Sequence, residues 1–192
     1  MAISYDNVLT KTYYGRFGDV VLRRGKGGKS IMSKRPDCSK VVKTEAQLAN
    51  MKRFAAATVY AKNALADPKR VAYYRKKKKS HQNIWNMAIS DFMMRPKVVA
   101  IDLNGYRGLK GNVISISAWD KYKVEAVSVL IYNDMNQVIE SGPAVARSFS
   151  AGREWDYKVT VMNPSYVGCR VVVRVTDLPG NVVQERVVVD ST

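Results

Sequence analysis

Apolar and polar residues alternate with a period of two in the second half of the chain, and no other feature constrains the fold as strongly. The alternating apolar positions are Trp155, Tyr157, Val159 and Val161 in "EWDYKVTV", and Cys169, Val171, Val173 and Val175 in "GCRVVVRVTD". Successive side chains of a strand point to opposite faces of its sheet. Each segment therefore predicts a strand with one buried face.

Further strands are indicated around these two segments by short apolar runs that turn signals separate. Their ranges are 98–103, 112–119, 123–133, 136–140 and 182–189, and the turns contain residues such as Asn104, Asn136 and Pro143. About seven short strands at this spacing are typical of an antiparallel β-sandwich with Greek-key connections. Trp119 or Trp155 can supply its buried tryptophan.

The period is helical between Thr44 and Pro96, which ends the last helix. Thr44 and Gln47 have the spacing of a capping box, Asp67 with Pro68 predicts a second helix start, and Ser80 is expected to cap a third helix in "HQNIWNMAISDFMM". The first helix is predicted to bury one apolar stripe. Its residues are Leu48, Met51, Phe54, Ala55, Ala61 and Leu65.

The segments "YYGRFGDVVLRR" and "KSIMSKR" read as extended, and "GKGG" between them suits a hairpin turn because glycine accepts a positive φ. The fold class predicted for the chain is therefore α+β. Residues 1–96 form a basic β-hairpin with helices, and residues 97–192 form an immunoglobulin-like antiparallel β-sandwich.

The stretch "RRGKGGKS" ends as a nucleotide-binding P-loop does, but it does not fit that motif. A P-loop needs a glycine five positions before Gly28, and Arg23 stands there. Pro36 also prevents the helix that must follow. If this loop binds phosphate, the phosphate is expected to belong to a polymer backbone, and the alternative is that its cations pair with carboxylates of a partner subunit.

Positive charge is concentrated in the first half of the chain. Residues 1–96 hold 21 Lys and Arg against 6 Asp and Glu, whereas residues 97–192 hold 11 against 10. A field of this sign attracts polyanions or acidic protein surfaces. The residues expected to bind an anion, nucleic acid or a partner are Arg23, Arg24, Lys26, Lys29, Lys34, Arg35, Arg75, Lys76, Lys77, Lys78 and Lys79.

Two family resemblances follow from particular motifs. The segments "VISISAWD", "EWDYKVTV" and "VTDLPGNV" resemble bacterial immunoglobulin-like modules, whereas "GRFGDVVLRR", "TEAQLANMKRF" and "IWNMAISDFM" resemble uncharacterised proteins of Bacteroidetes and their phages that pair a basic hairpin with helices. Immunoglobulin-like modules are binding and building units on cell surfaces and virions. The resemblance thus implies a non-enzymatic role.

Residues suited to catalysis or metal binding are few, and no catalytic residue, metal or cofactor is predicted. His81 is the only histidine and follows a lysine run, which excludes a two-histidine metal site. Cys169 is expected to act as a small apolar residue, and Cys38 as an incidental thiol. Asp102, Asp120 and Asp177 stand at strand ends, where hydrogen bonds to the turn backbone are expected rather than Ca²⁺.

The N-terminus lacks the apolar run of a secretory signal, and no stretch approaches the eighteen apolar residues of a membrane span. Synthesis in the cytoplasm is expected, with no small-molecule substrate and no disulfide.

The predicted function is therefore that of a structural assembly protein, such as a virion or filament component, anchored by its basic module. The hairpin has little core of its own, so its edge must bury either on the helices of its own chain or on a neighbour by strand addition. The alternative function is that of a nucleic-acid-binding accessory protein without sequence preference.

Overall fold

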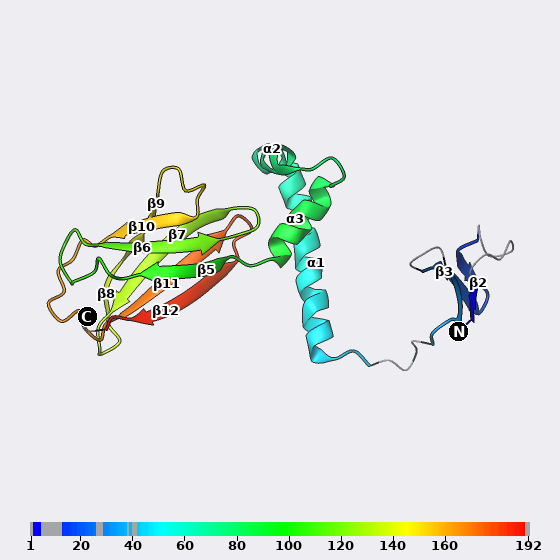
Figure 1. Cartoon of the computed structure of the whole chain (residues 1–192), viewed down its shortest axis with the longest axis horizontal. Coiled ribbons are helices and arrows are strands. Elements are labelled where there is room, and N and C mark those ends of the chain that lie inside the picture. Colours follow the sequence, from blue (N-terminus) through cyan, green and yellow to red (C-terminus); the bar gives the residue numbers. More distant parts are fainter. Residues whose placement is uncertain (1, 5–12, 26–28, 38, 40–41, 191–192) are drawn as a thin grey trace. The chain divides into compact units, whose positions relative to one another are not determined.

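The computed structural model describes residues 2–4, 13–25, 29–37, 39 and 42–190 (Figure 1). Their contacts divide the chain into two compact units, Met1–Gln47 and Leu48–Thr192, and each is described here by itself. The division falls earlier than Pro96, where the change of period had suggested a boundary. Lys26 and Cys38 lie outside the described residues.

The first unit contains a four-stranded antiparallel sheet. Its strands are β1 (Ala2–Ser4), β2 (Gly15–Phe17), β3 (Val20–Arg24) and β4 (Ser30–Lys34), in the order β1-β4-β3-β2. The predicted hairpin is confirmed as β3 and β4. The extended run before it was predicted as one segment, but it divides at Gly18, whose φ is 54°. A positive φ at the first residue of a two-residue turn suits a type II′ hairpin, so β2 folds back on β3.

Three helices follow: α1 (Glu45–Ala66), α2 (Pro68–Lys77) and α3 (Ile84–Met93). The capping box is confirmed, because Thr44 N donates to Gln47 Oε1 at 3.0 Å and Gln47 N donates to Thr44 Oγ1 at 3.3 Å. Asp67 caps α2 as predicted. The prediction of Ser80 as the cap of α3 was wrong. The cap is Asn83, three residues later, whose Oδ1 accepts a hydrogen bond from Trp85 N.

The strands from β5 onward form two four-stranded antiparallel sheets (Figure 1). The first has the order β5-β6-β10-β9 and the second the order β12-β11-β7-β8. Their bounds are β5 (Lys97–Asp102), β6 (Val113–Trp119), β7 (Val124–Tyr132), β8 (Val138–Pro143), β9 (Val145–Ala146), β10 (Glu154–Lys158), β11 (Arg170–Asp177) and β12 (Val182–Val188). If β8 is set aside as an extra edge strand, the other strands can be lettered A to G in chain order. The first sheet then has the order A-B-E-D and the second the order G-F-C, as in immunoglobulin domains. The α+β fold with an immunoglobulin-like sandwich is thereby confirmed.

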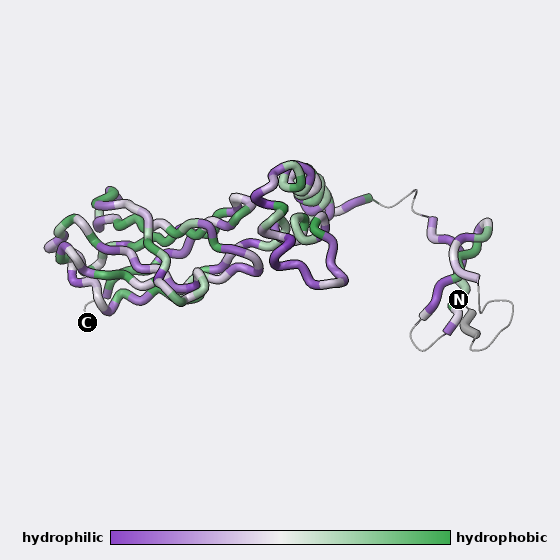
Figure 2. The backbone as a smooth tube through the Cα atoms, turned by 90° about the horizontal axis from the view of Figure 1, so that it is seen from above, coloured by the Kyte–Doolittle hydropathy of each residue, from purple (hydrophilic) through white to green (hydrophobic). Residues whose placement is uncertain are grey.

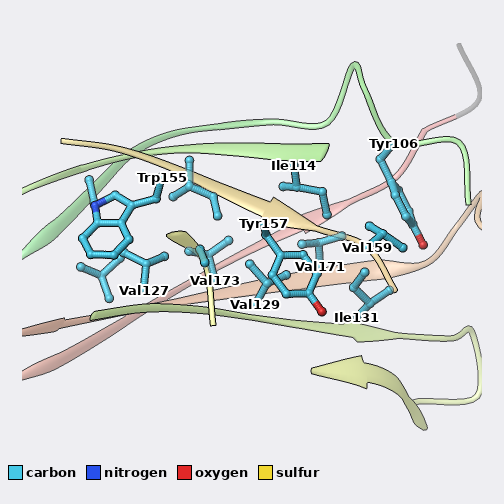
Figure 3. Packing of buried hydrophobic residues seen from close by; sticks show 14 of the residues in the cluster. Tyr106, Ile114, Val127, Val129, Ile131, Trp155, Tyr157, Val159, Val171 and Val173 are labelled. Atoms are coloured by element: carbon cyan, nitrogen blue, oxygen red, sulfur yellow. The ribbon is translucent and has the colours of Figure 1, made fainter. Parts of the chain in front are cut away.

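The sandwich core lies where the alternation placed it (Figure 3). Val171, Val173 and Val175 of β11 are fully buried, and Trp155 and Tyr157 of β10 face them from the other sheet. Hydrophobic and hydrophilic residues are interspersed along the chain of this unit (Figure 2). Val161 was predicted on the buried face of the segment "EWDYKVTV". It lies beyond the end of β10 and is exposed, so this prediction was wrong for Val161.

The helices are tied to the sandwich by hydrogen bonds at its β6–β7 and β11–β12 turns. Tyr73 of α2 donates its hydroxyl to Tyr122 O at 2.7 Å. Asn181 Nδ2 donates to Phe92 O at the end of α3 at 3.1 Å. These contacts explain why the second unit contains the helices as well as both sheets.

Candidate interaction surfaces

The basic residues predicted in the first unit lie on both faces of its sheet. Arg23 pairs with Ile31, and Arg24, the next residue along β3, pairs with Ser30, so their side chains point to opposite faces. The Arg24 guanidinium lies over the Tyr14 ring at 5.6 Å. Lys34 and Arg35 at the end of β4 are exposed, whereas Lys29 is half-buried. The predicted cations that the structure describes in this sheet are therefore divided between its two faces.

Four apolar residues and two cations share one face of this sheet. The register places on it Phe17, Val20, Leu22 and Met32, with Lys34 and Arg24 towards its two ends. Phe17 is 57% exposed and Met32 is 44% exposed. None of the described residues between 13 and 47 is buried. A small sheet needs a covered hydrophobic face for independent stability, and the described residues of this unit do not bury one.

The second predicted cluster, Arg75–Lys79, lies at the C-terminal end of α2 and all five residues are exposed. Cations at this end interact favourably with the helix dipole. Lys77 also has a structural role, because its Nζ donates to Tyr122 O and lies over the Tyr73 ring at 5.1 Å. The remaining four residues form the α2 basic end: Arg75, Lys76, Lys78 and Lys79.

The predicted buried stripe of α1 was mostly wrong. Of its six residues only Ala61 is buried, and the buried face consists instead of Ala57, Tyr60, Ala61 and Ala64. Side chains of α2 and α3, among them Tyr74 and Met87, cover this face. The larger apolar side chains lie on another side, where Leu48, Met51 and Val59 are 45%, 51% and 61% exposed. Together with exposed Ala55 they follow i, i+3, i+7, i+11 spacing, and they are called the open stripe of α1.

A buried polar chain links the three helices and was not found from the sequence. Tyr60 and Tyr74 hydroxyls are 2.9 Å apart, and Tyr74 donates to Asp91 Oδ2 at 2.5 Å. Asp91 is fully buried, and burial raises the pKa of its carboxyl to about 7, against the lowering effect of the Tyr74 hydrogen bond. Its other oxygen, Oδ1, has no hydrogen-bond partner. Asp91 had appeared in sequence only as a polar residue within a helix.

The strand-end aspartates behave as the sequence analysis favoured, since each accepts hydrogen bonds from its own turn. Asp102 Oδ1 accepts from Asn104 N at 2.9 Å, Asp120 Oδ2 from Tyr122 N at 2.6 Å, and Asp177 Oδ1 from Asn181 N at 2.6 Å. Within the described part of the chain, no three His, Cys, Asp or Glu side chains are grouped so that they could hold a metal ion.

The two other residues considered for chemistry have ordinary surroundings. His81 is exposed in the turn before α3. Cys169 is buried at the start of β11, where its Sγ donates to Ser165 O at 3.1 Å. Its burial agrees with the interpretation of a small apolar residue.

A pocket of about 540 Å³ lies between α2, the β6–β7 turn and the β9–β10 loop. Three of its cations already have partners: Lys77 at Tyr122 O, Lys121 at Ser90 Oγ, and Lys123 at Glu125. Trp155 lines it but is only 8% exposed. These contacts give the pocket a role in joining the helices to the sandwich.

Comparison with known proteins gives distant structural similarity and no family. No family model matches the chain, and no curated protein matches its sequence. The solved structure of CopC from Methylosinus trichosporium OB3b is 17% identical, with a TM-score of 0.37, over 50% of this chain and 94% of that one. A fungal alcohol oxidase of the AA5 family in complex with copper is 12% identical, with a TM-score of 0.36, over 51% of this chain and 21% of that one.

None of the helices that the structure describes combines the length and the apolar character needed to cross a membrane.

Proposed function

We propose that the protein is a structural assembly protein, a virion or filament component that associates with further copies of itself through its N-terminal sheet and α1. The observation that carries this proposal is the uncovered sheet, whose described residues include none that is buried. The four apolar residues of one face, Phe17, Val20, Leu22 and Met32, would be covered by the same face of a second copy, as in an isologous interface. Lys34 and Arg24, towards the two ends of this face, would stay at the rim of the interface in contact with water.

The open stripe of α1 supports the same proposal. Leu48, Met51 and Ala55 have the alternating three- and four-residue spacing of coiled-coil core positions. α1 is 22 residues long, yet its buried residues begin only at Ala57. Pairing with α1 of a second copy would remove these side chains from water, at about 25 cal/mol for each Å² of apolar surface.

The positive charge of residues 1–96 predicts how the strength of self-association changes with salt concentration. Two copies of a basic module repel each other, and salt screens that repulsion while apolar contacts persist. Self-association is therefore expected to strengthen, or at least survive, between 0.1 and 1 M salt. Nucleic-acid binding through phosphate contacts would weaken steeply over the same range.

We expect Leu48→Lys with Met51→Lys to abolish self-association of the full chain. Two cations would then repel each other across the paired helices. Light scattering with size exclusion should show a mass that rises with concentration for the unchanged protein, and the 21.5 kDa monomer for the variant.

The matched control is Ala56→Lys with Asn63→Lys, which adds the same charge at exposed positions of α1 on the side of Lys52. This variant should associate like the unchanged protein. A monomer at every concentration and salt for the unchanged protein would refute the proposed function.

A second candidate function, nucleic-acid binding without sequence preference, is favoured by the α2 basic end. Its four exposed cations would contact phosphates and release counterions. A monomeric protein whose oligonucleotide affinity falls steeply with salt, and falls further when all four cations are replaced by glutamine, would favour this function over assembly.

A further inference from the structure

The outer face of the sheet β12-β11-β7-β8 carries a group of three arginines, although residues 97–192 as a whole are nearly neutral. Val171, Val173 and Val175 of β11 point into the core, so Arg170, Val172 and Arg174 point outward. Arg186 of β12 stands opposite Val172 and shares its face. A basic side chain therefore lies on each side of Val172 along β11, and a third lies beside it on the next strand.

The three arginines line one hollow of about 280 Å³. Its other lining residues are Tyr132, Asn136, Val172 and Gln184, and none of them is acidic. The outward positions of β7, β11 and β12 that pair around this hollow also include no Asp or Glu. Asp134, in the β7–β8 turn, lines an adjoining hollow that shares Arg170 and Asn136.

The spacing allows the three guanidinium groups to converge. Arg170 and Arg174 are four residues apart on one strand, about 13 Å, and Arg186 lies about 8 Å from each by strand rise and strand separation. An arginine side chain is long enough for all three to reach a common point above Val172. The Arg170 guanidinium is already held over the Tyr132 ring at 5.2 Å. Arg174 is only partly exposed, and its Nε is buried with no hydrogen-bond partner.

We propose that this hollow binds a doubly charged tetrahedral oxyanion, a phosphate or sulfate group. Three cations on one face of a sheet repel one another, and a buried donor with no partner among the described residues requires an explanation, of which a bound ion is one. A dianion offsets the repulsion of all three arginines at once, because guanidinium groups donate paired hydrogen bonds to such oxygens. Val172 forms the apolar floor, and the Gln184 amide adds a neutral donor at the rim.

The ligand chemistry can come from two sources, a free anion or a terminal phosphate on a larger molecule. Backbone phosphodiesters carry one charge each and are spread along a chain, so they fit a convergent site less well. The probes are therefore inorganic phosphate, sulfate, and one single-stranded oligonucleotide with and without a 5′-terminal phosphate, all at the same ionic strength.

The test follows the Nε–H signals of the arginine side chains by NMR in the full chain. Saturable shifts of the signals from Arg170, Arg174 and Arg186 are expected with phosphate or sulfate. Arg186→Gln, at an exposed position of the edge strand β12, should weaken binding about tenfold, the loss of one or two charged hydrogen bonds. The triple variant with Gln at all three positions lacks these side-chain signals, so phosphate binding is followed in every variant by the backbone amide signals of β11 and β12 as well. Their saturable shifts should be abolished in the triple variant.

The matched control replaces Arg75, Lys76 and Lys78 by glutamine, which removes the same charge from the α2 basic end. Phosphate affinity at the hollow should stay within about twofold, since these cations belong to another surface. Equal losses in both triple variants would show that net charge alone attracts the anion and would overturn the proposal. So would a preference for the oligonucleotide lacking a terminal phosphate, or linear shifts without saturation.

Discussion

Asp91→Asn is expected to raise the free energy of unfolding above pH 8 by roughly 2 kcal/mol. The carboxyl is fully buried, and burial raises its pKa from 3.8 to about 7. Each unit of such a difference corresponds to about 1.4 kcal/mol. Asparagine retains an oxygen that can accept from the Tyr74 hydroxyl and carries no charge to desolvate. Its Nδ2 takes the place of Asp91 Oδ1, which has no partner among the described residues, and this buried donor offsets about 1–3 kcal/mol of the gain.

The direction of this effect with pH follows from linkage. The folded-state pKa of Asp91 lies above its unfolded value, so its contribution to stability is fully present below about pH 4 and is lost as pH rises through about 7. Asp177, whose pKa burial also raises, acts in the same direction in both proteins and cancels in the comparison. The difference between the two proteins should therefore grow between pH 4 and 8.

Urea unfolding at several pH values measures this difference. Asp134→Asn, which removes a carboxylate from an exposed turn, is the matched control for the loss of one acidic group. If the stability of Asp91→Asn relative to the unchanged protein is the same at pH 5 and pH 8, Asp91 does not hold a raised pKa.

Gly108→Ala is expected to destabilise the sandwich by about 3 kcal/mol or more. Gly108 has a φ of 70°, and a Cβ there would lie 2.0 Å from Asn163 O, a backbone atom held by the Asn163 N to Gly108 O hydrogen bond of 2.7 Å. The left-handed conformation costs about 1–2 kcal/mol for a residue with a Cβ, and overpacking adds about 1–3 kcal/mol.

Gly111→Ala separates these two contributions. Gly111 has a φ of 94°, but no atom lies within 4 Å of the position that a Cβ would take. Thermal unfolding should therefore show the conformational effect alone in Gly111→Ala and a clearly larger loss in Gly108→Ala. Equal losses would mean that the loop at Asn163 moves away without resistance.

The sandwich could be predicted because the inner faces of its strands repeat at every second residue. The inner face of β11 consists of Val171, Val173 and Val175, and a slip by one position would turn these three valines outward. The caps of α1 and α2 were equally legible, since Thr44, Gln47 and Asp67 act through bonds to residues two or three positions away. The arrangement of the strands into two sheets came from the family resemblance and the strand number rather than from any single residue.

The exposed surfaces were harder to predict, because they depend on which apolar face of a helix or sheet is covered by other parts of the fold. α1 has two apolar faces, and the larger side chains suggested the wrong one. The face with Ala57, Ala61 and Ala64 is buried because large side chains of α2 and α3, such as Tyr74 and Met87, pack on it. The arginine hollow was missed for another reason: Arg170, Arg174 and Arg186 come from two strands, and only the register of β11 with β12 brings them together.

Hydrogen exchange at two protein concentrations tests the central claim, that the N-terminal sheet is completed by association. The account predicts that amides of β3 and β4 exchange quickly in dilute protein and become protected several-fold as concentration rises, while β11 stays protected throughout. Equal exchange of β3 and β4 at both concentrations would contradict it.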